Sequence, residues 1–151
     1  MTKFDPKDPD FEGKVRRAFA NQSLLATLGM RLELVEPGMV RVALPFASHI
    51  LQQHGFVHGG AVAAMGDTAC GFAAMSLMPS GCGILTVEFK ISLMAPAQGD
   101  CLVATGRVVK PGRTLIFSET EISANRGSET RLIARTTATL MLITGRDNIV
   151  G

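Results

Sequence analysis

The chain has 151 residues, a formal net charge of +2 and 46% hydrophobic residues, which suits one domain and excludes a mostly disordered protein. It contains no Trp and no Tyr, so a basic face with stacking aromatic side chains is hard to assemble, and we expect no nucleic-acid partner. The three cysteines lack CxxC spacing, which argues against a zinc finger or a disulfide framework and for a reducing compartment.

Three regions are expected: a disordered polar tail over residues 1–10, one domain over residues 11–145, and a C-terminal tail over residues 146–151. The first region carries charges and prolines without an apolar core, so it is not a secretory signal, and a cytoplasmic location is the default expectation. The apolar stretch 55–78 holds His58 and Asp67 and is built from Ala and Gly more than Leu, so we expect no membrane span.

Helical spacing of apolar residues after Asp10, a possible cap, predicts one peripheral helix that ends near Gly29. From Met30 the period changes to alternation, which predicts a hairpin that turns at Pro37-Gly38. Residues 45–57 show no clear period and are expected to form a loop.

Residues 58–77, rich in Ala and Met, predict a long central helix that Pro79 and the following glycines stop. Strands are expected over residues 85–93, 101–110 and 114–123, followed by a last long strand. We expect one face of that strand to carry Leu132, Ala134, Ala138, Leu140 and Leu142.

These elements predict an α+β fold in which five or six antiparallel strands surround the central helix. That helix is apolar on nearly every side, and a single curved sheet covers only part of its circumference. We therefore expect a second subunit to cover some of the rest.

Asp67 is the only residue with a permanent formal charge between Arg41 and Glu88, and it lies in the middle of the predicted central helix. At spacings of three and four, the residues that share one helix face with Asp67 have very small side chains, which leave room for a ligand or another backbone. They are Gly60, Ala63, Ala64, Cys70, Gly71 and Ala74. A reactive acid or base explains a carboxylate there, and a carboxylate bound to backbone amides is the structural alternative.

His58, Gly59 and Gly60 stand where the central helix should begin, and the free amides of its first turn favour developing negative charge. This predicts an oxyanion site, with an ordinary glycine junction as the alternative. Eight residues separate Gly59 from Asp67, about 12 Å along the axis, too far for both to reach one carbonyl carbon from the same helix. Antiparallel central helices of a dimer would bring each aspartate near the other chain's glycines.

Other chemistries fit less well. The chain has no G-x-S-x-G elbow, no P-loop and no G-x-G-x-x-G motif. His54 and His58 have helical metal-site spacing, but Gly55 follows His54 and no H-E-x-x-H motif is present, so we expect no metal and no cofactor.

The run from Gln52 to Gly60, QQHGFVHGG, followed by Asp67-Thr68-Ala69, resembles the hotdog-fold acyl-CoA thioesterases of the PaaI-like, phenylacetate-pathway type. The likeness extends through Thr86-Val87-Glu88-Phe89-Lys90 and Ala95-Pro96-Ala97 and covers roughly residues 29–142. It implies a long helix wrapped by an antiparallel sheet, and a homodimer or homotetramer whose active site is shared between subunits. It also implies hydrolysis of an acyl-CoA thioester to the free acid and coenzyme A.

The resemblance also implies roles for individual residues. Gly59 would donate its amide to the thioester oxygen, with His58 orienting that region. Asp67 of the partner subunit would act as nucleophile or as general base on water. Gln52, where many PaaI-like members have Asn, would hold the water or the thioester end, and Thr86 would bond near the carboxylate.

Gly60 and Phe56 are expected to contact substrate. Residues that could meet the phosphates of coenzyme A are Lys90, Lys110, Arg113, Arg126 and Arg131. Two alternatives remain: a hotdog protein that binds acyl-CoA without turnover, as a sensor or carrier, and a hotdog hydratase or dehydratase.

Overall fold

The computed structural model describes residues 4–151. The helices, in chain order, are α1 (Phe11–Ala20), α2 (Ser23–Leu28), the short 3-10 helix η1 (Ser48–Ile50) and α3 (Gly59–Met75). The strands are β1 (Arg31–Glu36), β2 (Met39–Pro45), β3 (Gly83–Leu93), β4 (Cys101–Pro111), β5 (Leu115–Arg126) and β6 (Glu129–Ile143). The predicted hairpin, central helix and C-terminal strands are all present, so the α+β prediction is confirmed.

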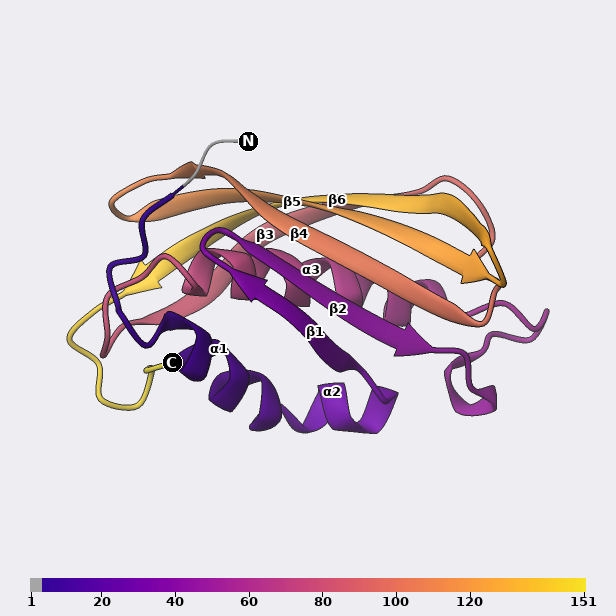
Figure 1. Cartoon of the computed structure of the whole chain (residues 1–151), viewed down its shortest axis with the longest axis horizontal. Helices are drawn as coiled ribbons and strands as arrows, with labels where there is room; N and C mark the ends of the chain where they lie inside the picture. The colour runs from indigo at the N-terminus through magenta and orange to yellow at the C-terminus, as the bar shows by residue number, and fades with distance from the viewer. Residues whose placement is uncertain (1–3) are drawn as a thin grey trace.

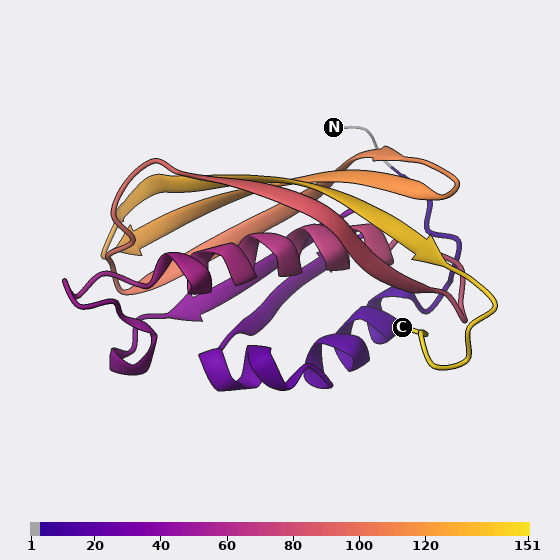
Figure 2. The same cartoon turned by 180° about the vertical axis from the view of Figure 1, so that it is seen from behind.

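The strands form one six-stranded antiparallel sheet in the order β1-β2-β4-β5-β6-β3, and α3 lies across its inner side (Figures 1 and 2). Alternate side chains of β4 and β5 are buried, because one face of each strand packs on the helix. Most of α3 is buried as well, as its apolar composition predicts.

Two glycines allow α3 to lie unusually close to the sheet. A Cβ atom on Gly106 of β4 would lie 2.2 Å from the carbonyl oxygen of Ala69, and one on Gly66 would lie 2.2 Å from Oγ1 of Thr136. Neither side of these contacts has room for another carbon atom. The helix is therefore held in one place over the sheet, which sets the positions of its N-terminus and of Asp67.

A β-bulge in β6 corrects the prediction for the last strand. Ile122 pairs with Ala134 but Ser123 pairs with Leu132, so Ile133 is the extra residue. The bulge exchanges the two faces of the strand beyond it. Leu132 is therefore exposed on the outer face, whereas Arg131, opposite Ala124, turns to the inner face.

The peripheral helix is also corrected, because it consists of two helices rather than one. Gln22 adopts an extended backbone between α1 and α2, and Leu25 is buried while Leu24 is exposed. The polar run from Asn21 to Ser23 offers no apolar side chain to the core, and Asn and Ser are weak helix formers. Gly29 ends α2 in a left-handed conformation, as expected.

Asp10 occupies the N-cap position of α1, but its side chain makes no capping bond and instead accepts from Arg17. The expected disordered tail falls partly on residues 1–3, which lie outside the described residues. Residues 4–10 pack onto the domain: Asp8 is buried and lies 3.1 Å from the ammonium of Lys14, which is also buried and donates to the carbonyl of Met78. No helix within residues 4–151 is long and apolar enough to cross a membrane.

Candidate active site

The loop before α3 is held by backbone hydrogen bonds at both ends. The N–H of Gln52 donates to the carbonyl of Phe56, and the N–H of Val57 donates to the carbonyl of Ala97. Gly55, between them, has a positive φ of 82°, which glycine adopts without strain. The side-chain oxygen of Gln52 accepts from the N–H of His54. These bonds place Gln52 and Phe56 beside the start of α3.

His58 caps α3. Its Nδ1 accepts a hydrogen bond of 2.8 Å from the N–H of Gly60, which requires an unprotonated Nδ1. The N–H of Gly59, the first residue of the helix, has no acceptor among the described residues. A free amide at the positive end of a helix is suited to an oxygen that gains negative charge. His58 thus orients the turn, and Gly59 supplies the unoccupied donor.

Asp67 lies two turns further along α3 and is partly exposed in the single chain. The hydroxyl of Thr86, on β3, donates a hydrogen bond of 2.7 Å to its Oδ1. The other carboxylate oxygen has no protein partner among residues 4–151. One oxygen is therefore held in position while the other stays available to water or to a substrate.

Asp67 and Gly59 line different cavities of the chain. Asp67 and Thr86 line a cavity of about 120 Å³ together with Gln22, which the break between α1 and α2 brings there. Gly59, Gln52 and Phe56 line a larger groove of about 400 Å³, which residues 93–97 complete. One chain therefore holds two separate halves of the expected site: Gln52, Phe56, Gly59 and the His58 cap in one, Asp67 and Thr86 in the other.

Several residues of these cavities were not singled out by the sequence analysis. Leu93 and Met94 line the Gly59 groove, and their hydrophobicity did not distinguish them from core residues. Ala95-Pro96-Ala97 is part of the resemblance to the PaaI-like family, but its sequence pattern indicates no role. Gln22 had no sequence signal, because its position depends on the unexpected break between the first two helices.

Strand β3 runs between the two halves and is an edge strand, since its only strand partner among the described residues is β6. It is unusually exposed for an apolar strand: Val87 is 57% exposed, Phe89 42% and Leu93 57%. An exposed apolar edge is a template for pairing with another chain. Both halves of the site therefore lie beside the exposed apolar edge that β3 forms.

Cys70 is the cysteine nearest Asp67 in the sequence, and its thiol does not reach the site. Its sulfur lies 3.1 Å from the hydroxyl of Thr120, inside the interface between α3 and the sheet. Burial raises the pKa of the Cys70 thiol to about 12, so the thiolate is not formed near neutral pH. The carboxylate of Asp67 and the N–H of Gly59 therefore remain as the candidate reactive groups of the site.

Comparison with known proteins identifies relatives of the whole domain. The model of the thioesterase superfamily matches residues 54–130. A Halobacterium salinarum protein, whose name assigns it provisionally as an esterase, is 30% identical over 147 residues, which cover 85% of this chain and 95% of that protein.

Comparison with solved structures also finds similar proteins. A thioesterase family protein from Silicibacter pomeroyi is 45% identical, with a TM-score of 0.87, and the match covers 89% of this chain and 99% of that one. The E. coli PaaI protein from the phenylacetic acid degradation operon is 21% identical, with a TM-score of 0.81 over 92% of this chain and 97% of that one, and it shares the fold. The hotdog fold expected from the sequence is confirmed.

Proposed function

The chain belongs to the thioesterase superfamily, and we propose that it hydrolyses the thioester between an acyl or aryl-acyl group and coenzyme A. The observation that carries the proposal is the pair of half-sites on either side of β3. One half offers a free amide at the start of α3, and the other offers a carboxylate held by Thr86. Acyl transfer needs both a donor for the oxyanion and a group that attacks or activates water.

The active site is complete only in a dimer under this proposal. Pairing of two β3 edges around a two-fold axis would place two α3 helices antiparallel, with Gly59 of one protomer facing Asp67 of the partner subunit. The same contact would cover Val87, Phe89 and Leu93, which a single chain leaves exposed. The expected assembly is a homodimer, or a homotetramer built from such dimers.

The reaction would start with the thioester carbonyl in the Gly59 groove. The N–H of Gly59 would bind the carbonyl oxygen as it becomes an oxyanion, and Gln52 would hold the attacking water or the thioester end. Asp67 of the partner subunit would attack the carbonyl carbon or take a proton from water, and Thr86 would keep its carboxylate aimed. Collapse of the tetrahedral intermediate would break the carbon–sulfur bond and release the coenzyme A thiolate. If water attacked, the acyl group would leave at once as the free acid; if Asp67 attacked, water would then cleave the mixed anhydride, releasing the acid and restoring the carboxylate.

A thiol-release assay on a panel of acyl-CoAs tests the proposal. Asp67→Asn keeps the size of the side chain and the acceptor for Thr86, and should lower turnover at least about a hundredfold, as expected for a lost acid-base catalyst. Wild-type protein that binds acyl-CoA without turnover would instead support a sensor or carrier. Turnover unchanged in a folded Asp67→Asn variant would contradict the assignment of Asp67.

Two matched variants of Gly59 test whether its N–H is the oxyanion donor. Gly59→Pro removes the N–H at the helix position that tolerates proline best, after a residue whose ψ of 136° suits a following proline. Gly59→Ala keeps the N–H and adds the same Cβ, which would lie 3.1 Å from the flexible end of Leu93. We expect Gly59→Pro to lose about a hundredfold in turnover, and Gly59→Ala much less. Equal losses would remove the amide from the mechanism.

A further inference from the structure

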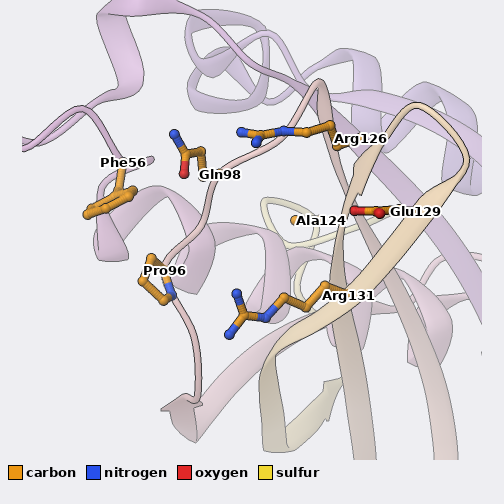
Figure 3. Close-up of a pocket in the computed structure, with 7 residues that line it drawn as sticks. All are labelled: Phe56, Pro96, Gln98, Ala124, Arg126, Glu129 and Arg131. Atoms are coloured by element: carbon orange, nitrogen blue, oxygen red, sulfur yellow. The ribbon is translucent and has the colours of Figure 1, made fainter.

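A third cavity adjoins the Gly59 groove and has no role in the chemistry described above. Its volume is about 300 Å³, and it is lined by Phe56, Pro96, Gln98, Ala124, Arg126, Glu129 and Arg131 (Figure 3). Phe56 and Pro96 also line the Gly59 groove. The two spaces therefore meet at these two side chains.

Two arginines reach this cavity from the turn between β5 and β6. Arg126 is the last residue of β5, and Arg131 lies opposite Ala124 in the ladder. The bulge at Ile133 turns Arg131 to the inner face, which Ala124 and Arg126 share. Figure 3 shows both side chains extending from the strands toward the segment that carries Pro96 and Gln98. The small side chain of Ala124 leaves the space between them open.

The fold makes little use of these two charges. Neither guanidinium takes part in an ion pair or a side-chain hydrogen bond among residues 4–151. The one acid of the cavity, Glu129, lies opposite Arg126 in the ladder, so the cavity keeps a net positive charge. Two arginines beside one small cavity match the geometry and the charge of a phosphate group, which a guanidinium binds with two parallel hydrogen bonds.

We propose that Arg126 and Arg131 bind the phosphate groups of coenzyme A, an inference that rests on the proposed function. A thioester placed at Gly59 has its acyl group on one side and the pantetheine arm on the other, and the arm ends in the phosphates. Phe56 and Pro96 border both the Gly59 groove and the cavity of the arginines, so an arm that leaves the groove past these side chains would reach the arginines. Of the five basic residues that the sequence offered for this role, these two line a cavity that shares Phe56 and Pro96 with the Gly59 groove.

Binding of coenzyme A itself, measured by titration calorimetry, tests the proposal without requiring turnover. Arg126→Ala and Arg131→Ala should each weaken binding about fivefold, and the double variant roughly twentyfold or more, as expected for partly exposed charge-assisted contacts. Glu129→Gln removes the opposing charge and should strengthen binding. The affinity of the wild type should fall with added salt more steeply than that of the double variant.

Arg146→Ala is the matched control, because it removes the same charge from an exposed arginine beyond the far end of β6, roughly 40 Å from Arg131 at the usual rise of a strand. It should leave the affinity unchanged. Equal weakening by Arg146→Ala and by the cavity variants, or no weakening by either, would overturn the proposal.

Substrates with and without the phosphates separate this proposal from the proposed function. With an acyl-CoA, the double variant should raise KM by the same factor as it weakens binding and leave kcat unchanged. With the corresponding S-acyl pantetheine, which lacks the phosphates, it should behave as the wild type. Equal losses on both substrates would refute the phosphate contact while leaving hydrolysis intact. Arginine-dependent binding of coenzyme A without any thiol release would refute the hydrolysis alone.

Discussion

Two inactive variants should restore each other's activity if the active site is shared between subunits. Gly59 and Asp67 line separate cavities within one chain and lie about 12 Å apart along α3, so each chain would contribute half of two sites. In a mixed dimer of Asp67→Asn and Gly59→Pro, one site carries both substitutions and the other carries neither. Such a dimer should have half of the wild-type activity.

The size of the effect follows from random association. Equal amounts of the two variants, unfolded and refolded together, give half mixed dimers, and the mixture should recover about a quarter of the wild-type rate. Each variant refolded alone should show about 1% of it. A thiol-release assay separates these values easily. Mixed dimers isolated with two different affinity tags should approach one half.

The control replaces Gly59→Pro with the double variant Asp67→Asn/Gly59→Pro. A dimer of this double variant with Asp67→Asn contains no intact site, so mixing should recover nothing. The same refolding steps and the same oligomer are present, which isolates the geometry of the site as the cause. Isolated mixed dimers of the two single variants that are no more active than their parents would refute the shared site, as would an active monomer.

Two further predictions concern stability. Gly66→Ala and Gly71→Ala gain the same helix propensity, about 1 kcal/mol, but a Cβ on Gly66 would meet Thr136 at 2.2 Å whereas one on Gly71 meets only Leu140 at 3.8 Å. Urea unfolding should show Gly71→Ala stabilised and Gly66→Ala destabilised by about 1–3 kcal/mol, and equal values would refute the close contact. A hydrogen bond from the N–H of Asp10 and, next in size, one from the side chain of Lys14 lower the pKa of Asp8. The ionised carboxylate therefore stabilises the folded protein fully above the unfolded pKa of about 4, and this contribution is lost as the pH falls through the pKa of the folded state. Between pH 6 and pH 3 the free energy of unfolding should therefore fall less in Asp8→Asn than in the wild type, and an equal fall would contradict the assignment.

Local sequence patterns determined much of the fold and the choice of candidate residues for the site. The apolar segment 58–77 predicted the central helix, and α3 occupies most of it, because helix formation depends on residues three and four positions apart. Asp67 and Gly59 were identified by what was unusual about them, a lone charge and a glycine pair at a helix start. Their separation along the helix also followed from the sequence, since the rise per residue is constant.

Tertiary structure decided how distant segments meet. The bulge at Ile133 turns Arg131 inward, and no alternation rule applied to the last strand could predict it, because register depends on pairing between two strands. The sequence named the basic residues that could meet phosphates, but only the folded sheet brought Arg126 and Arg131 to one cavity beside Phe56. Contacts between residues far apart in the chain arise from packing, which the local period of apolar residues does not encode.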